Sequence, residues 1–377
     1  MVKTGIDSIA SAEGVLRGRR IGLMTNQTGV DGKMRSTIDI LNEHFRLNAL
    51  FACEHGVRGD AQAGAAIGSM TDPETGVPIF SVYGASHHLS DEMLDAFDVF
   101  VFDMQDVGAR FYTYLYSLSY AMQDCARAGK PVVVLDRPNP LGGETVAGTL
   151  LDENVHSFVG EYAMPTRYAL TIGEYALWVR DHLQLDLELH VAALIGWQRS
   201  MQYEETGLCF VPPSPNCASL HTARAYIGTC IFEGTNLSEG RGTTLPFEYI
   251  GAPFVDAERL VRRMNALALP GVLWRRTHFT PQFSKHAHQQ CAGVQMHLTS
   301  PAADPFAAGL FLLDELLDMH ADKIEWTGAN DTPYLTIDRL LGTDAYRLGR
   351  LSARELLAQH RELILEWQRQ TLPFRLY

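Results

Sequence analysis

Short apolar runs alternate with segments of helical spacing through the first half of the chain, and this alternation constrains the fold most. Residues 98–102 (DVFVF) and 132–135 (VVVL) are nearly all apolar, which is typical of strands buried on both faces of a parallel sheet. Residues 111–128, between them, have the length of a helix. Strands that alternate with helices favour a parallel sheet with helices on both faces. The sequence therefore predicts an α/β fold that begins with a Rossmann-like, doubly wound domain.

Four further strands and two further helices complete this predicted domain. We expect the strands at residues 20–26, 47–53, 79–83 and 187–194, and the helices at residues 34–45 and 171–183. Thr171, with Glu174 three residues later, predicts a capping box at the start of the last helix. The first strand is not followed by a Gly-x-Gly-x-x-Gly turn, and no Walker sequence occurs. The fold class therefore does not argue for a nucleotide.

The second half of the chain has a different, mixed pattern. A proline-rich break at residues 211–216 precedes a glycine-rich stretch at residues 228–251. We then expect helices at residues 256–266, 305–320, 337–341 and 352–368, and strands at residues 272–276 and 293–298. At 377 residues the chain is long enough for two domains. We predict a Rossmann-like catalytic domain at residues 1–222 and a smaller α+β auxiliary domain at residues 223–377.

Charge and composition exclude several classes of partner. The formal net charge of −13 disfavours nucleic acid, which is bound by neutralising its phosphates. No apolar run approaches the length of a membrane span, and the N-terminus lacks the apolar core of a signal peptide. The protein is therefore expected in the cytoplasm, or in the periplasm or outside the cell if a leader was trimmed. Six scattered cysteines predict reduced, buried thiols. The oligomeric state stays open.

Polar side chains follow the predicted strands where the carboxyl edge of the sheet should lie, which is where open α/β sheets bind ligands. They are Asn26 after the first strand, Glu54, His55 and Arg58 after the second, Asp103, Gln105, Asp106 and Arg110 after the fourth, and Asp136, Arg137 and Asn139 after the fifth. Structural alternatives exist. Asp136 and Arg137 would then form a local ion pair, and Asp106 would cap a helix that starts near Ala109. His55 would bond a neighbouring carbonyl.

A second polar cluster lies in the other half of the chain, at residues 232–244. Glu239 and Arg241 stand there among glycines, which allow close backbone approach to a ligand. Such a loop suits sugar hydroxyls, although it would also suit packing under the first domain. His286 and His288, with Cys291 nearby, have ligand types for a metal, but ordinary loop residues are the favoured interpretation. We expect no metal and no cofactor.

Carboxylates are the usual groups that break glycosidic bonds, one as a proton donor and one as a nucleophile or base. Glu54 is the first candidate for the acid. The second group is left open among Asp106, Asp103 and Glu239, and an N-acetyl sugar offers its own acetamido group as a further alternative. The stereochemical outcome is open as well.

An ordered set of motifs resembles the exo-β-N-acetylmuramidase family, long catalogued as a domain of unknown function. The motifs are residues 23–30, 54–59, 103–114, 136–143, 171–174, 213–216, 233–244, 251–253 and 291–295. The resemblance implies that terminal N-acetylmuramic acid is released from the non-reducing end of peptidoglycan fragments, in a cleft between the two domains. It implies catalytic roles for Glu54, His55 and Asp106. Where the family often has Arg-His-Gly-Met-Thr, residues 167–171 read Arg-Tyr-Ala-Leu-Thr.

N-acetylmuramic acid carries a lactyl carboxylate, which an acidic protein would bind with a local guanidinium. We predict that at least one of Arg58, Arg110, Arg137 and Arg241 contacts it. The other predicted substrate-binding residues are Asn26, Gln105, Tyr112, Asn139, Asn216 and Glu239. The expected partners are peptidoglycan-derived disaccharides or muropeptides. Two alternatives are a non-catalytic muropeptide-binding protein, and a hydrolase that acts on another cell-wall bond such as an amide.

Overall fold

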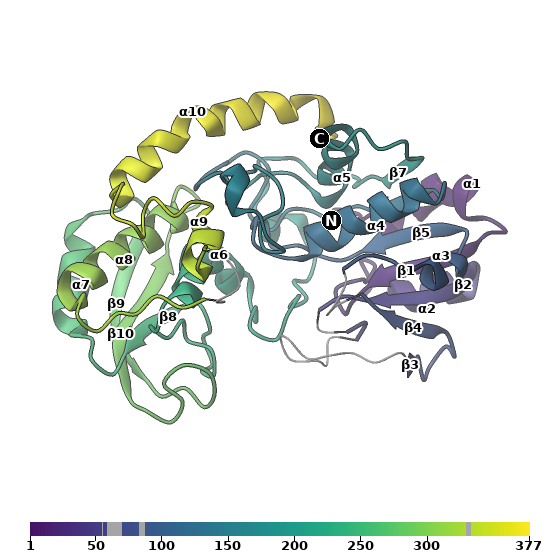
Figure 1. The fold of residues 1–377 in the computed structure, drawn as a ribbon. Helices are drawn as coiled ribbons and strands as arrows, with labels where there is room; N and C mark the ends of the chain where they lie inside the picture. The colour runs from purple at the N-terminus through teal and green to yellow at the C-terminus, as the bar shows by residue number, and fades with distance from the viewer. Residues whose placement is uncertain (55, 59–69, 83–86, 329–332) are drawn as a thin grey trace.

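The structure is a computed structural model that describes residues 1–54, 56–58, 70–82, 87–328 and 333–377. The chain forms two sheets that lie side by side (Figure 1). The first has seven strands in the order β3-β4-β2-β1-β5-β6-β7, and the second has three in the order β8-β10-β9. Within the described residues, no helix combines the length and the apolar character that crossing a bilayer requires.

The large sheet is parallel except at one edge. Its strands are β1 (Arg20–Thr25), β2 (Arg46–Ala52), β3 (Met70–Thr71), β4 (Pro78–Ser81), β5 (Val99–Asp103), β6 (Val132–Leu135) and β7 (Leu189–Ala192). Only β3 pairs antiparallel, with β4. Successive side chains of a strand face opposite sides of the sheet. Val99 and Val101 of β5 accordingly belong to one buried cluster, and Phe100 and Phe102 belong to the other.

Helices cover both faces of this sheet, which confirms the predicted doubly wound α/β fold. The 3-10 helix η1 (Ile6–Ala12), with α1 (Glu13–Leu16) and α2 (Thr37–His44), packs on the face of Val99 and Val101. The helices α3 (Asp91–Asp95), α4 (Tyr114–Arg127) and α5 (Ile172–His182) pack on the other. The predicted capping box at Thr171 and Glu174 is present at the start of α5.

The second part of the chain is α+β and smaller, as predicted. Its elements are α6 (Leu220–Thr229), β8 (Tyr249–Ala252), α7 (Ala257–Ala266), β9 (Val272–Phe279), β10 (Cys291–Leu298), α8 (Pro305–His320), α9 (Thr336–Leu341) and α10 (Ala353–Thr371). Short 3-10 helices occur at η2 (Glu153–Val155), η3 (Tyr203–Thr206), η4 (Cys230–Gly234) and η5 (Leu372–Phe374). The sequence analysis did not anticipate α6 and β8, which lie at or near the glycine-rich stretch. The domain boundary at residue 222 remains a prediction.

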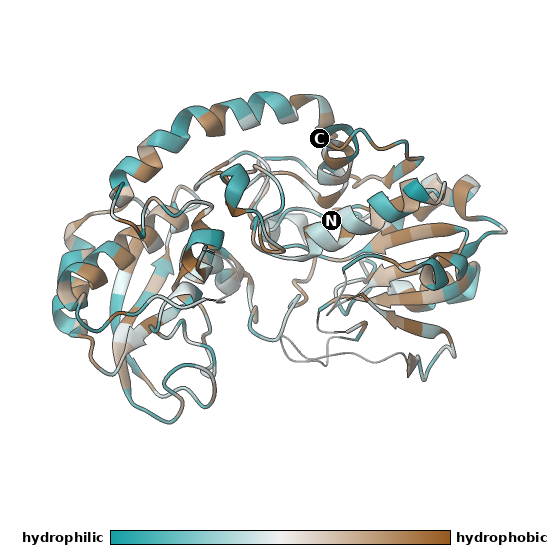
Figure 2. Ribbon diagram, in the orientation of Figure 1, coloured by the Kyte–Doolittle hydropathy of each residue, from teal (hydrophilic) through white to brown (hydrophobic). Residues whose placement is uncertain are grey.

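The last helix, α10, leads from the smaller part back to the large sheet (Figure 1). The indole N–H of Trp367 donates to the carbonyl of Tyr168 at 3.0 Å, and the Tyr377 hydroxyl donates to Asp136 Oδ2 at 2.7 Å. Hydrophobic residues dominate the strands of the large sheet, whereas α10 alternates between hydrophilic and hydrophobic residues along its length (Figure 2). One buried cluster includes residues of both sheets and Trp367, so the two parts share a continuous core.

Candidate functional site

The strand order places a topological switch point at β1. From β1 the chain continues to β2 on one side, and β5 pairs with β1 on the other side. The loops after β1 and β5 therefore leave in opposite directions, and a crevice forms at their carboxyl ends. Ligands of open α/β sheets bind in such a crevice.

A cavity with about 480 Å³ of empty space lies near this edge, and we call it the Glu54 cavity. Three parts of the chain line it. Glu54 follows β2, and Phe111, Tyr112, Thr113 and Tyr114 lead into α4; Ser214, Asn216 and Cys217 come from the proline-rich break, and Tyr226, Arg241 and Phe247 come from the smaller part. The cavity thus lies between the two sheets, as the resemblance implied.

Glu54 is the acidic residue of this cavity. Its side chain is half-buried, and the Thr113 hydroxyl lies 3.4 Å from Glu54 Oε2, which accepts its hydrogen bond. No other carboxylate occurs among the lining residues that the structure describes. The arrangement therefore offers one group that can give or take a proton next to a bound ligand.

Aromatic rings form much of the remaining wall. Tyr112 meets Tyr114 edge to face at 4.9 Å between ring centroids, and Tyr226 meets Phe247 in the same way at 4.7 Å. Burial raises the pKa of Tyr112 well above its usual range, so its phenol stays neutral. Its hydroxyl is buried and has no hydrogen-bond partner within the described part of the chain. Because a buried hydroxyl without a partner is costly, this oxygen is a candidate contact for a ligand.

Arg241 supplies the positive charge. Its Nε and Nη2 lie 2.9 and 2.5 Å from Glu233 Oε1, and its guanidinium stands over the Phe247 ring at 5.0 Å. Burial lowers the pKa of Arg241, but Glu233 and Glu239 raise it by more, so the group stays charged. Glu239 is 1% exposed and pairs with Lys285 Nζ at 2.8 Å. Glu239 therefore neutralises a cation instead of lining the cavity.

The structure places two of the four predicted arginines elsewhere. Arg110 is 0% exposed, and its Nη1 and Nη2 donate to the carbonyls of Thr149, Met164 and Leu340. Arg137 pairs with Asp103, with Nε 2.5 Å from Oδ1 and Nη2 2.9 Å from Oδ2. Neither arginine lines the Glu54 cavity. Their interactions are those of structural residues, and Asp103, which Arg137 holds, does not line the described part of the cavity either.

The local ion pair between Asp136 and Arg137 is also wrong. Asp136 instead accepts hydrogen bonds from the Thr171 hydroxyl at 2.8 Å and the Gly173 N–H at 2.7 Å. It therefore ties β6 to the start of α5, and Arg137 is free to pair with Asp103.

Arg58 pairs with the buried carboxylate of Asp72, 2.9 Å from its Oδ1, and is not among the described residues that line the Glu54 cavity. His55 lies outside the described residues. Of the four predicted arginines, Arg241 is therefore the one found among the described residues that line the Glu54 cavity.

Asp106 lies behind the cavity, not in its described lining. Its Oδ2 accepts the Gly108 N–H at 2.6 Å and the Tyr168 hydroxyl, while its buried Oδ1 has no partner within the described residues. Burial raises the pKa of this carboxyl to about 6, although both hydrogen bonds lower it. Asp106 closes a turn and does not cap a helix, because α4 begins at Tyr114.

Three predicted amide side chains hold loops together. Asn26 Oδ1 accepts from the Thr28 N–H at 2.9 Å. Gln105 Nε2 donates to the carbonyls of Asp106 and Pro138, and Asn139 Nδ2 donates to the Leu170 carbonyl at 2.9 Å. They shape the edge of the sheet without lining the cavity.

Of the predicted site residues, the structure brings together Glu54, Tyr112, Asn216 and Arg241. The sequence analysis did not assign Thr113 or Tyr226 to the site. Thr113 lies within the motif at residues 103–114, whereas Tyr226 lies on α6, a helix that was not predicted from the sequence.

The metal interpretation of the second histidine cluster gains no support from the contacts. His286 Nε2 lies 2.8 Å from the Asn236 carbonyl. In the ranges that the structure describes, no three His, Cys, Asp or Glu side chains lie together in a group that could hold a metal ion.

Fold and cavity together define a two-part α/β protein with an acidic, aromatic ligand cavity at the carboxyl edge of its sheet. A family profile described as "Exo-beta-N-acetylmuramidase NamZ, N-terminal" matches residues 21–221, and the corresponding C-terminal profile matches residues 224–377. The chain belongs to this exo-β-N-acetylmuramidase NamZ family.

Relatives agree with this assignment. The chain is 45% identical over 338 residues to the peptidoglycan beta-N-acetylmuramidase NamZ of Bacillus subtilis (strain 168), which covers 88% of this chain and 81% of that protein. Two crystal structures of DUF1343 family proteins from Bacteroides fragilis NCTC 9343 are similar to it over 100% of this chain and 99% of theirs. Their TM-scores are 0.89 and 0.77, at 34% and 30% sequence identity.

Proposed function

We propose that this chain is an exo-β-N-acetylmuramidase that removes N-acetylmuramic acid from the non-reducing end of peptidoglycan fragments. The observation that carries the proposal is the Glu54 cavity. It combines one carboxyl group, a wall of aromatic rings and a guanidinium in a recess between the two sheets. A few polar groups fixed in an apolar, concave site are what a small ligand needs for orientation.

Glu54 is the proposed general acid. A proton from its carboxyl group passes to the glycosidic oxygen as the bond to the anomeric carbon breaks, and the leaving sugar departs as an alcohol. Thr113, whose hydroxyl donates to Glu54 Oε2, orients the carboxyl group. Because Glu54 is the one carboxylate among the described lining residues, we propose that the substrate's acetamido oxygen attacks the anomeric carbon. Water then opens the resulting ring, and the configuration is retained.

Arg241 is the proposed contact of the lactyl carboxylate. Its Nε and Nη2 bond Glu233, and its Nη1 makes no hydrogen bond with any described residue. A guanidinium can hold two carboxylates at different edges of its plane. The Phe247 ring beneath it keeps this plane in place. The lactyl group distinguishes the muramic sugar from N-acetylglucosamine, so Arg241 would set the specificity.

The first test is Glu54→Gln. We expect kcat for release of a chromogenic leaving group from an N-acetylmuramide to fall by about 100-fold or more, because a neutral amide cannot donate the proton. The Kd for substrate, measured by calorimetry, should change little. Glu74→Gln, on an exposed carboxylate that pairs with Arg58, is the matched control. Full turnover by Glu54→Gln would refute the assignment and favour a binding protein.

The second test is Arg241→Met, with Arg58→Met as its control. We expect Arg241→Met to lose most of the preference in kcat/KM for the N-acetylmuramide over the N-acetylglucosaminide, a loss of about tenfold or more for one charge-assisted contact. Arg58→Met should keep the preference. An unchanged preference in Arg241→Met, or a loss confined to Arg58→Met, would show that the carboxylate binds elsewhere.

A further inference from the structure

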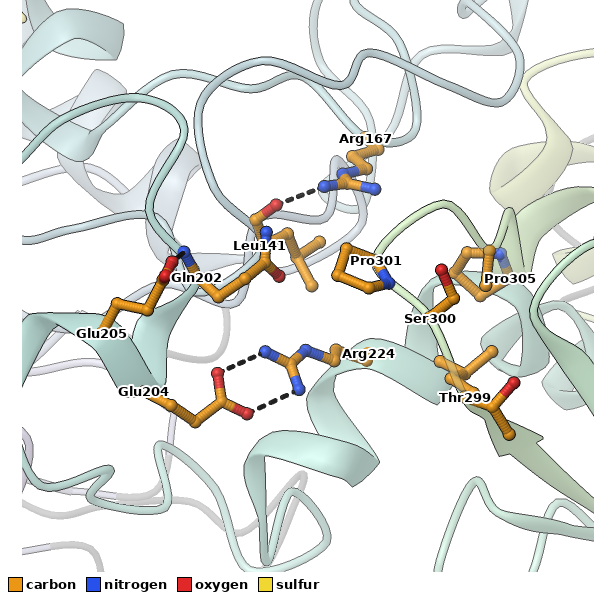
Figure 3. A pocket seen from close by; sticks show the side chains of 12 residues that line it. Leu141, Arg167, Gln202, Glu204, Glu205, Arg224, Thr299, Ser300, Pro301 and Pro305 are labelled. Atoms are coloured by element: carbon orange, nitrogen blue, oxygen red, sulfur yellow. Dashed lines mark hydrogen bonds and ion pairs between the residues drawn. The ribbon is translucent and has the colours of Figure 1, made fainter.

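A second and larger cavity lies between the two parts of the chain, with about 1010 Å³ of empty space. Figure 3 shows its side chains. It is lined by Leu141, Arg167, Gln202, Glu204 and Glu205 from the first part, and by Arg224, Leu298, Thr299, Ser300, Pro301, Ala303 and Pro305 from the second. We call it the Arg167 cavity. Helix α6 contributes Arg224 to this cavity and Tyr226 to the Glu54 cavity, so the two cavities are separate sites that share one helix.

Arg167 is the unusual residue of this cavity. It is 8% exposed, and its Nη2 donates to the Leu141 carbonyl. Its Nε is buried without a hydrogen-bond partner among the described residues, and Arg167 forms no ion pair with any of them. Burial lowers the pKa of Arg167 to about 10, although the negative charge of the Asp304 carboxylate raises it, so the guanidinium remains charged at neutral pH.

Arg110 shares part of that situation, because it is buried, forms no ion pair with any described residue, and has an Nε without a hydrogen-bond partner. Unlike Arg167, it does not line this cavity. Arg137 and Arg199 each pair with a carboxylate, Asp103 and Glu174, and Arg110 donates to three carbonyls. A desolvated cation without a partner is unfavourable, and an anion that binds beside it removes the penalty. Arg167 combines a desolvated guanidinium that lacks an ion pair with a place in the lining of a cavity, where an anion can reach it.

The remaining charges of the cavity already have partners. Arg224 Nη1 and Nη2 hold the two carboxylate oxygens of Glu204 at 2.8 and 2.6 Å. Glu205 accepts the backbone N–H of Gln202 at 2.6 Å. These bonds lie on one side of the cavity in Figure 3, with Arg167 above them.

Apolar side chains define the rest of the space. Leu141, Pro301 and Pro305 supply apolar surface to the lining, and Thr299 and Ser300 add hydroxyl groups (Figure 3). An inorganic anion would leave this apolar surface wet, whereas an organic anion would cover it. The lining therefore favours a ligand with a single anionic group attached to an apolar body.

We propose that the Arg167 cavity is a second ligand site, which binds a small organic carboxylate with its carboxylate on Arg167 and its apolar body against Leu141, Pro301 and Pro305. The ligand contacts both parts of the chain. Its carboxylate takes a hydrogen bond from Arg167 Nη1. The site is independent of the reaction in the Glu54 cavity.

The test is calorimetric titration of the full chain with three probes. They are N-acetylleucine, its neutral amide N-acetylleucinamide, and inorganic phosphate. We expect N-acetylleucine to bind with one-to-one stoichiometry, and the amide and phosphate to bind at least about tenfold more weakly, because each lacks either the charge or the apolar body. Equal binding of the amide would refute a role for charge, and equal or tighter binding of phosphate would refute an organic ligand.

Substitutions in the Arg167 cavity test whether the ligand binds there. Arg167→Met should weaken N-acetylleucine binding at least about tenfold, whereas Arg361→Met, on the exposed side of α10, should leave it unchanged. Ser300→Trp narrows the cavity at an exposed position without touching the guanidinium. It should abolish binding while hydrolysis of the chromogenic N-acetylmuramide continues. Wild-type affinity in Ser300→Trp would overturn the proposal even if Arg167→Met failed to fold, and so would absence of N-acetylleucine binding to the unmodified protein.

Discussion

Asp106 allows a quantitative test of how burial acts on one carboxyl group. Asp106→Asn keeps an oxygen that can accept the Gly108 N–H and the Tyr168 hydroxyl. It replaces the buried Oδ1, which has no partner among the described residues, by a neutral amide nitrogen. The variant therefore removes a buried charge while it preserves shape and acceptors.

The magnitude follows from the shift in pKa. Burial raises the pKa of Asp106 from 3.8 to about 6, and a shift of about 2 units corresponds to about 3 kcal/mol. A raised folded-state pKa means that the folded state holds the proton more tightly. The contribution to stability is therefore present below pH 3.8 and is lost as the pH rises to about 6. Between about pH 4 and pH 7 the stability of the variant relative to the wild type should therefore rise by about 3 kcal/mol, because the cost of the unpartnered amide N–H groups is the same at every pH.

Urea unfolding of both proteins, at several values between about pH 4 and pH 8, measures this difference. All other titrating groups are common to the two proteins and cancel. A stability difference between the two proteins that does not change with pH would refute the reasoning. Turnover of the variant should stay within about tenfold of wild type, because Asp106 is not in the described lining of the Glu54 cavity. A larger loss would restore the catalytic role that the sequence predicted.

Two further predictions concern stability. Ala169 has a φ of 59°, so Ala169→Gly should raise the free energy of unfolding by up to about 1 kcal/mol. Relief of the left-handed backbone strain should outweigh the conformational entropy that glycine adds to the unfolded chain. Ala358→Gly, at an exposed position within α10, should lower the free energy of unfolding by about 1 kcal/mol. A change of the same sign in both variants would contradict the explanation. Trp367→Ala should lower the free energy of unfolding by about 3–5 kcal/mol, and Trp367→Phe, which loses the bond to the Tyr168 carbonyl, by less. If chemical denaturation shows no loss of unfolding free energy in Trp367→Ala, α10 does not stabilise the fold.

The strands of the first domain were predictable because their apolar runs are continuous. β6 spans Val132–Leu135, the predicted range, and α8 at Pro305–His320 also matches. In the second half of the chain, glycines made a helix and a strand difficult to predict. A Cβ on Gly228 would stand 1.7 Å from the Pro305 carbonyl oxygen, and one on Gly251 would stand 2.3 Å from that of Ala292. These glycines permit close packing within a helix and a strand, and sequence spacing alone does not distinguish them from glycines of a loop.

The site was predictable in location but only partly in membership. The rule that residues following parallel strands meet at the carboxyl edge of the sheet correctly predicted the common location of Glu54, Asp103 and Arg137. It does not say which polar groups satisfy one another, as Asp103 and Arg137 do, and which remain available to a ligand. Tyr226 comes from a helix far along the chain, and its place in the Glu54 cavity depends on packing between the two parts.

Helix α10 gives the two parts of this chain a second, non-covalent connection, in addition to the covalent one at the proline-rich break before α6. Trp367 and Tyr377 fasten the returning segment to the far part. Two bodies joined at one point can swivel freely, whereas two bodies joined at two points can only swing about the line between them. Because the two parts also share a continuous core, this second connection should keep the walls of the Glu54 cavity in a constant orientation to one another.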